Sequence, residues 1–167
     1  MFFLVLLGLI TLAVTVSQTF AFTRMCRYVA TELEKPEPSY VPRLAVILPC
    51  KGLDPGFHEN MAKLLDQDYS KDGKPQFEVI FAVATMEDPA YQALLSVCAA
   101  SPHVSSRVVV AGINVQRAQK LNNQLEALKH LSPDVEAIAF VDSDVIARPD
   151  FLRYLVGGLS DPHTGAS

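Results

Sequence analysis

The stretch Ala139-Phe140-Val141-Asp142-Ser143-Asp144 decides the fold. Three apolar residues run directly into Asp-Ser-Asp, which is the pattern of a buried strand that ends at a cleft. Two carboxylates one residue apart need water, a cation or hydrogen-bond donors around them. A divalent cation such as Mg2+ or Mn2+ fits this pair, because it binds one or two carboxylates and leaves its other positions to phosphate oxygens and water. The hypothesis is that the stretch holds a nucleotide's diphosphate; the alternative is that its acids only cap a turn.

Composition narrows the class of protein before any other motif is considered. The chain has 167 residues and a formal net charge of −4, and its pI is near 5.5. This charge argues against a nucleic-acid partner, which would be held through phosphate contacts with basic residues. The three cysteines, Cys26, Cys50 and Cys98, are odd in number and widely spaced. They match neither a disulfide framework nor a zinc site, and reduced thiols are expected.

The first 23 residues carry no charge and are rich in Leu, Val, Ile and Phe. A helix of about 22 residues spans ~33 Å, enough for a hydrocarbon core of about 30 Å, so residues 1–23 are predicted to be a transmembrane anchor. Arg24 and Arg27 follow, and the positive-inside rule then puts the rest of the chain in the cytoplasm. A cleaved signal peptide is the less favoured alternative, because no basic segment precedes the apolar run. Residues 24–42 are predicted to be a linker, extended and proline-rich from Thr31.

The remaining residues alternate between strand and helix patterns. Apolar runs predict strands at 44–48, 77–83, 107–110 and 137–141, and helices are expected near 60–65 and at 89–100, 116–131 and 151–159. This order predicts an α/β domain with a mainly parallel sheet flanked by helices. Ligands bind at the carboxyl ends of such strands, where Asp88, Asp142 and Asp144 are expected to converge. No glycine fingerprint of a dinucleotide fold follows the first strand, which disfavours a dehydrogenase.

The helix predicted at 116–131 combines an apolar stripe with a polar start. Its stripe at helical spacing is expected to face the core and comprises Ala118, Leu121, Leu125 and Leu128. Lys120 lies near the helix start, at the same edge as the strand ends. Asn122 and Asn123 are interpreted as capping or packing groups, and Asp54 as a surface charge.

Several of these motifs together resemble a known family. Family 2-type glycosyltransferases with the GT-A fold are similar in Val46-Ile47-Leu48-Pro49, Leu65-Asp66-Gln67-Asp68-Tyr69 and Val141-Asp142-Ser143-Asp144. The related family 21, that of the ceramide glucosyltransferases, is similar in Glu87-Asp88-Pro89-Ala90, in Gln119-Lys120-Leu121-Asn122-Asn123-Gln124-Leu125, and in Asp142-Ser143-Asp144-Val145 with Pro149-Asp150 beyond. An N-terminal membrane helix also resembles that family.

The resemblance implies a membrane-bound inverting glycosyltransferase that moves a sugar, expected to be glucose, from a UDP-sugar to a lipid hydroxyl such as that of ceramide. Asp88 would contact the base or ribose and Lys120 the diphosphate. Asp142 and Asp144 would form the DxD motif, with Asp142 on the ribose and both carboxylates on the Mg2+ or Mn2+ ion. The cation and the lysine would stabilise the charge that develops on the leaving diphosphate.

One departure from the family pattern limits the expected activity. The family carries, after the DxD segment, an Asp that serves as general base and a Gln/Arg-x-x-Arg-Trp motif, whereas this sequence contains no Trp. Inverting transfer needs a base within reach of the acceptor hydroxyl. Residues 43–167 are therefore expected to be the truncated, nucleotide-sugar-binding half of a GT-A domain, and the isolated chain is expected to be inactive. Two alternatives stay open: the donor half of a processive polysaccharide synthase, and a non-catalytic membrane-anchored nucleotide-binding module.

Overall fold

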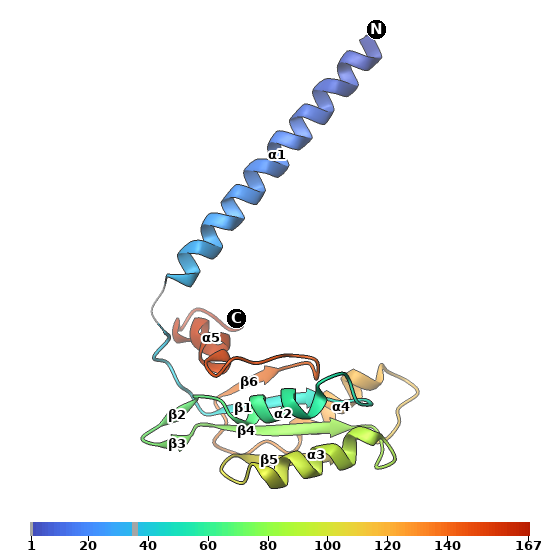
Figure 1. Ribbon diagram of the computed structural model, residues 1–167, viewed down its shortest axis with the longest axis vertical. Helices are drawn as coiled ribbons and strands as arrows, with labels where there is room; N and C mark the ends of the chain where they lie inside the picture. The colour runs from blue at the N-terminus through green and yellow to red at the C-terminus, as the bar shows by residue number, and fades with distance from the viewer. Residues whose placement is uncertain (1, 35–36) are drawn as a thin grey trace. The chain divides into compact units, whose positions relative to one another are not determined.

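The computed structural model describes residues 2–34 and 37–167 (Figure 1). Met1 and residues 35–36 of the predicted linker lie outside the described part. The chain divides into an N-terminal unit that ends at Glu37 and a globular unit from Pro38 to Ser167. Each unit is described by itself below.

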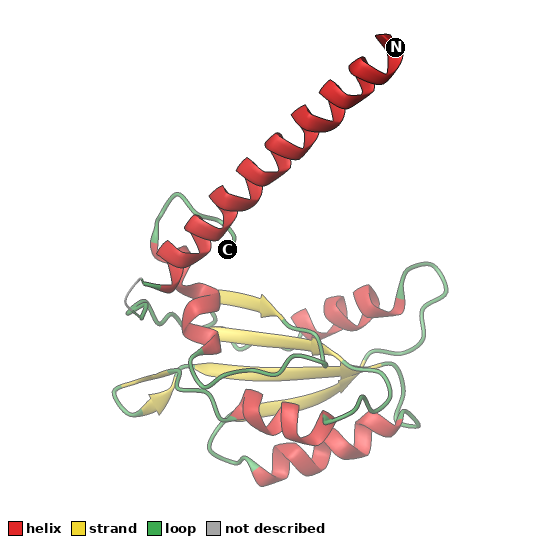
Figure 2. Ribbon diagram, turned by 45° about the horizontal axis from the view of Figure 1, so that its top comes forward, coloured by secondary structure: helices red, strands yellow, loops and turns green. Residues whose placement is uncertain are grey.

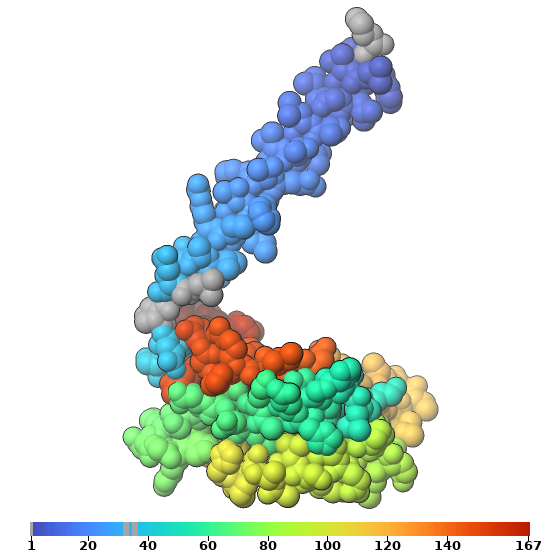
Figure 3. All heavy atoms as spheres, viewed as in Figure 1, coloured from blue at the N-terminus to red at the C-terminus, as the bar shows by residue number. Residues whose placement is uncertain are grey.

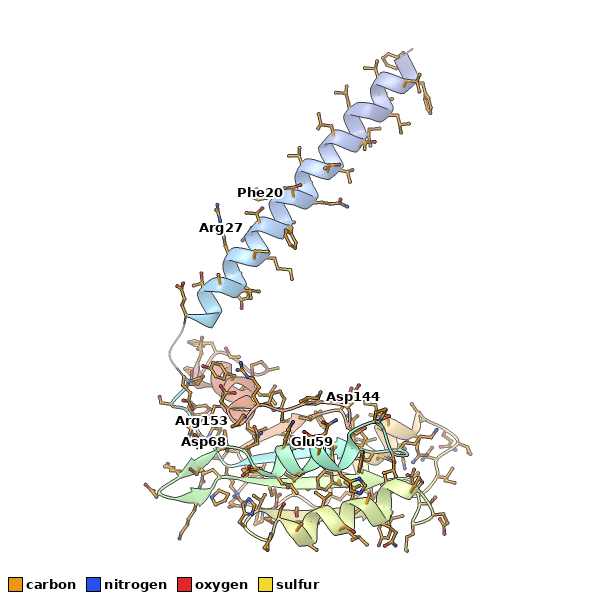
Figure 4. The ribbon with its side chains drawn as sticks, in the orientation of Figure 1. Phe20, Arg27, Glu59, Asp68, Asp144 and Arg153 are labelled. Atoms are coloured by element: carbon orange, nitrogen blue, oxygen red, sulfur yellow. The ribbon has the colours of Figure 1, made fainter. Side chains whose placement is uncertain are left out.

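The N-terminal unit is one long helix, α1 (Phe2–Leu33). Its stretch Phe2–Thr31 is long and apolar enough to cross a membrane, judged by length and composition. The threonine hydroxyls of α1 are satisfied within the helix, because each donates to the carbonyl four residues earlier; these are Thr11, Thr15, Thr19, Thr23 and Thr31. Phe20 and Arg27 extend from the helix in Figure 4.

The start of the predicted linker is wrong, because α1 continues through Thr23 to Leu33. Residues 24–33 contain neither glycine nor proline, so nothing in the backbone interrupts the helical hydrogen bonds. The segment 24–33 is therefore helical, including residues 31–33, which were predicted to be extended.

The globular unit is organised around a four-stranded sheet, shown in yellow in Figure 2. Its strands lie in the order β5-β4-β1-β6 and all pairs are parallel. They are β1 (Leu44–Pro49), β4 (Phe77–Val83), β5 (Ser105–Val110) and β6 (Ala137–Phe140). Leu44 in the central strand pairs with Phe77 on one side and Ala137 on the other. The mainly parallel α/β sheet predicted from the sequence is confirmed.

Between α2 and β4 the chain forms a small antiparallel hairpin of β2 (Ser70–Lys71) and β3 (Lys74–Pro75). Asp72 and Gly73 at its tip both have positive φ, 53° and 73°, which is the backbone of a two-residue hairpin loop.

Helices cover both faces of the sheet. One face packs against α2 (Phe57–Leu65), α3 (Pro89–Ala100) and α5 (Phe151–Gly157), and a short 3-10 turn, Gly158–Ser160, follows α5. The other face packs against α4 (Gln119–Leu128). Alternate residues of β1 serve the two layers, since Val46 and Leu48 belong to the larger core and Ile47 to the smaller one. In the space-filling view, α2 lies between α3 and the segment that leads to α5 (Figure 3).

Two burial predictions are wrong, the second only in part. The apolar run into Asp142 is not buried on both faces, because Ile138 and Phe140 are 41% and 53% exposed. Among the described residues, α4 packs on β1, β4 and β5 but leaves that face of β6 open.

The apolar stripe predicted on the helix 116–131 faces the core only in part, since Leu128 packs against the smaller core but the other leucines of the stripe do not. Asn123 and Ala127 are the buried residues of α4, whereas Leu121 and Leu125 are exposed. The small Ala127 lets the helix approach the sheet closely, and Asn123 bonds to Ala82 of β4. These contacts fix which side of α4 faces inward.

Candidate donor site

A cleft opens at the carboxyl edge of the sheet, between β1 and β6. The chain builds the sheet outward from β1 to β4 and β5 and then crosses back to place β6 on the other side. A reversal of this kind is the topological switch point at which open α/β sheets bind ligands. The cleft has a volume of about 290 Å³ and is lined by Pro49, Cys50, Lys51, Asp54, Gln119, Lys120, Asn123, Asp142, Ser143 and Asp144. It thus brings together three of the four predicted site residues.

The Asp-Ser-Asp stretch forms an irregular loop directly after β6. Val141 N donates to Ile47 O at 3.0 Å, which continues the pairing with β1 by one residue. Asp142 and Asp144 are exposed on this loop, and Asp144 is labelled in Figure 4. Between them, Ser143 Oγ donates to Asp54 Oδ2 at 3.3 Å. The loop therefore presents two carboxylates to the cleft and is tied by its middle residue to the loop that follows β1.

Lys120 lies across the cleft in the first turn of α4. Its Nζ is 2.6 Å from Asp142 Oδ1, and both side chains are 58% exposed. An ion pair this exposed contributes little to stability, because water screens it and both side chains lose freedom. The lysine can therefore exchange this carboxylate for another anion at small cost.

The start of α4 is fixed by a chain of amide hydrogen bonds. Gln119 Nε2 donates to Asn123 Oδ1 at 2.7 Å, and Asn123 Nδ2 donates to Ala82 O at 3.2 Å. Asn122 Nδ2 donates to Ala111 O at 3.1 Å. The packing role predicted for the two asparagines is confirmed. Because the bonds reach the ends of β4 and β5, they also hold Lys120 at the edge of the sheet.

Asp88 lies outside the cleft lining. It is the N-cap of α3, and its Oδ1 accepts from Ala90 N and from Gly52 N, both at 2.9 Å. Gly52 has a φ of +67°, a backbone conformation that favours glycine. Asp88 thus anchors the loop 50–56, which supplies Cys50, Lys51 and Asp54 to the cleft. Its predicted contact with the nucleotide stays a prediction.

Sequence reasoning missed the three residues that this loop supplies to the cleft, which are Cys50, Lys51 and Asp54. Asp54, interpreted as a surface charge, lines the cleft; it follows a strand end, as the other site acids do, and that signal could have identified it. Cys50 is buried at the base of the cleft. Burial raises the pKa of its thiol from 9.0 to about 12, and the charges of Asp88 and Asp54 add to the shift. Cys50 is therefore a neutral lining group rather than a nucleophile.

The donor atoms in the cleft suit a cation that shares its coordination with a ligand. Within residues 2–34 and 37–167, no group of three or more His, Cys, Asp or Glu side chains could hold a metal ion alone. Asp142 and Asp144 provide two exposed carboxylates. Mg2+ and Mn2+ accept such an incomplete set when phosphate oxygens and water supply the rest.

The comparison with protein families agrees with this geometry. Residues 2–166 match the family model described as glycosyl transferase family 21. The chain belongs to this family. Ceramide glucosyltransferase 1 of Caenorhabditis elegans is 26% identical over 116 residues, which cover 70% of this chain and 23% of that relative. Ceramide glucosyltransferase of Komagataella phaffii is 31% identical over 74 residues, or 44% of this chain and 14% of that one. The chain thus spans less than a quarter of these curated relatives.

Solved structures show the fold of the family 21 chain. A mannosyltransferase from Pyrobaculum calidifontis, solved with GDP-Man and Mn2+, superposes with a TM-score of 0.63 and 25% identity over 90% of this chain and 43% of its own. TarS 1–349 of S. aureus, solved with UDP-GlcNAc, gives a TM-score of 0.50 and 22% identity over 72% of this chain and 32% of its own. The GT-A fold predicted from the sequence is confirmed.

Proposed function

We propose that this chain is the donor-binding part of a membrane-bound inverting glycosyltransferase that moves glucose from UDP-glucose to the hydroxyl of a lipid such as ceramide. The observation that carries the proposal is the pair Asp142 and Asp144, which faces Lys120 across a cleft at the switch point of the sheet. The names of the ceramide glucosyltransferases to which the chain is similar support glucose as the sugar and ceramide as the acceptor.

The residues of the cleft match the chemistry that donor cleavage requires. Asp142 and Asp144 would hold Mg2+ or Mn2+, and that ion, when bound, neutralises charge that develops on the leaving diphosphate. Lys120 adds a fixed positive charge from α4, and it needs no proton transfer to act. Asp88 orders the loop after β1 through Gly52, and in this proposal its carboxylate also lies at the nucleoside end of the donor.

The proposed location follows from α1. A helix of this length and apolarity is a candidate membrane span, and Arg24 and Arg27 come directly after its most apolar part. The positive-inside rule then puts the globular unit in the cytoplasm, which is a compartment that also suits free thiols.

The test is calorimetry with UDP-glucose on the full chain in lipid nanodiscs, with Mn2+ and with chelator. The expected result is binding that Mn2+ strengthens and that is only weak with chelator, and we expect the gain from Mn2+ to disappear in Asp144→Ala. Asp134→Ala is the matched control, because Asp134 is an exposed acid that precedes β6 at the opposite edge of the sheet and pairs with Arg43. Parallel titrations with GDP-mannose and UDP-GlcNAc decide which nucleotide and sugar the cleft selects.

Equally tight binding with Mn2+ and with chelator would contradict the proposal, and so would no binding by a chain whose circular dichroism shows it to be folded. Equal binding by Asp144→Ala and Asp134→Ala would assign the two acids to capping. That outcome would favour the non-catalytic membrane-anchored module.

A further inference from the structure

The loop that carries Asp142 and Asp144 is attached at its far end to a part of the chain about 80 residues away. Gln67, just after α2, bonds to both sides of the turn before α5. Its Nε2 donates to Arg148 O at 2.8 Å, and its Oε1 accepts from Leu152 N at 3.2 Å. The same Nε2 donates to Lys63 O, in the last turn of α2, at 2.9 Å. One half-buried carboxamide thus joins the end of α2 to the chain on both sides of Pro149 and Asp150.

Asp68 reinforces this attachment. Its backbone N donates to Pro149 O at 2.7 Å, and its own carbonyl accepts from Arg153 Nε at 2.6 Å. Arg153 Nη2 also lies 3.3 Å from Asp68 Oδ1. Figure 4 shows Asp68 and Arg153 together, away from Asp144. We call the hydrogen bonds between residues 67–68 and residues 148–153 the clamp.

The clamp matters because the loop has little structure of its own. Between Val141 and Arg148 the chain forms neither helix nor strand, and an irregular segment needs partners outside itself for its backbone polar groups. It is tied to Ile47 at its start, to Asp54 through Ser143, and to Gln67 at its end. Asp144 lies between the second and third attachments, and α2 connects the loop containing Asp54 to the clamp.

We propose that Gln67 is a positioning residue of the donor site: its carboxamide sets the path of residues 142–148 and thereby the placement of Asp144 toward a bound divalent cation. The inference rests on the proposed function for its ligand, a metal-bound nucleoside diphosphate. Groups that orient metal ligands from outside the coordination sphere commonly change metal affinity by about 10–100-fold when they are removed. Gln67 acts one step further from the ion, since it bonds to the backbone of the loop and not to the carboxylates, so we expect an effect at the lower end of this range.

The test variant is Gln67→Met, which keeps the length of the side chain and removes all three of its hydrogen bonds. Gln92→Met is the matched control, an exposed glutamine on α3. Hydrogen–deuterium exchange on the full chain in nanodiscs, with neither metal nor nucleotide present, is the first measurement. We expect faster exchange confined to residues 142–152 in Gln67→Met and no change in Gln92→Met. Unchanged exchange in that segment, or equally faster exchange throughout the globular unit, would overturn the positioning role.

The second measurement is the Mn2+ concentration at which UDP binding is half-maximal. We expect this midpoint to rise about tenfold in Gln67→Met, while the weak binding of UDP with chelator stays as in the wild type, because Lys120 is not attached to the clamp. A merely structural role would lower the unfolding temperature and leave the Mn2+ midpoint of the folded fraction unchanged. If the wild type shows no metal-dependent binding, the proposed function fails, and the exchange measurement still decides whether Gln67 orders the loop.

Discussion

The sheet carries two groups of acids whose surroundings are opposite. Glu78 in β4 has no exposed side-chain surface, and its carboxylate accepts from Arg107 Nη2 at 3.0 Å, from Ser132 N at 2.9 Å and from Ser132 Oγ at 2.6 Å. Asp142 and Asp144, at the carboxyl edge, are exposed, and an ion pair with Lys120 is the interaction found for Asp142.

The difference shows which carboxylates stabilise the fold and which can accept a ligand. A buried carboxylate must have its hydrogen bonds supplied by the protein, and Glu78 has them. It joins the start of β4 to β5 and to the segment before β6. The acids at the other edge keep oxygen lone pairs toward solvent, which a cation can use without disturbing the core.

The largest expected effect is on stability, from Glu78→Ala. It removes the buried acceptor that Arg107 and Ser132 share and leaves their part-buried donors without it, so we expect a loss of about 3 kcal/mol in the free energy of unfolding. Chemical denaturation followed by tyrosine fluorescence measures it, since the chain contains no Trp. Glu59→Ala is the control, an exposed acid of α2 paired with Lys63, and it should change little. Equal stability of Glu78→Ala and Glu59→Ala would contradict the stabilising role of the buried carboxylate.

The next effect concerns binding. Asp144→Asn and Asp142→Asn should each weaken Mn2+-dependent UDP binding by at least about tenfold, since a lost ligand costs no less than a lost group that orients one. Without metal, the free energy of unfolding of Asp144→Asn should equal or exceed that of the wild type, because one of two neighbouring like charges is gone. That of Asp142→Asn should change by no more than about 1 kcal/mol, because this variant also loses the exposed ion pair with Lys120. A large loss of stability in either variant would show that these acids resemble Glu78 after all.

A smaller effect is expected from Lys120→Met. Its exposed ion pair predicts a change in stability of no more than about 1 kcal/mol. UDP binding should weaken several-fold both with Mn2+ and with chelator, because the lysine attracts phosphate without the ion. Calorimetry under both conditions separates Lys120 from Asp144, whose effect should vanish with chelator. A Lys120 effect that requires the metal would mean that the lysine only orients Asp142.

The smallest expected effect is that of the Cys50 thiol, which changes the free energy of unfolding only at alkaline pH. Its pKa is about 12 in the folded chain against a usual 9.0, so above pH 9 the unfolded chain gives up the proton first and stability falls as pH rises. We expect the wild type to lose about 1 kcal/mol more than Cys50→Ala between pH 8 and pH 10. At pH 8, iodoacetamide should modify the exposed Cys26 and spare Cys50, as mass spectrometry can show. Rapid alkylation of Cys50 would mean that the cleft is open to its base.

The sequence predicted most accurately the strand and the helix that are specified by their own residues. The strand at 77–83 matches β4 to the residue, and the predicted helix at 89–100 matches α3, because Pro89 occupies its first turn and Asp88 caps it. The same means, position after a strand end, led to Asp142 and Asp144, which line the cleft; their role in binding stays a prediction.

What the sequence could not show depends on contacts between distant segments. The inward side of α4 is set by the bond from Asn123 to Ala82 and not by its leucines. The role of Asp54 in the cleft depends on Ser143, which lies 89 residues further along the chain. Gln67 lies in a motif on which the resemblance rests. Nothing in the sequence around Arg148 and Leu152 indicates, however, that a glutamine side chain bonds to their backbone.

The position of β6 also has a consequence for the order in which the chain acquires structure. β6 attaches to β1, and beside this pair Arg43 N donates to Glu136 Oε2 across 93 residues of sequence. Contacts between residues so far apart form slowly, because a long loop must close first. During synthesis, β1 would therefore pair with β4 while its other edge stays open, and an open edge can recruit a wrong strand. The wall of the cleft that carries Asp142 and Asp144 thus forms after β4 has paired with β1. A chain released before Phe140 is made would keep the other edge of β1 open and would be prone to aggregate.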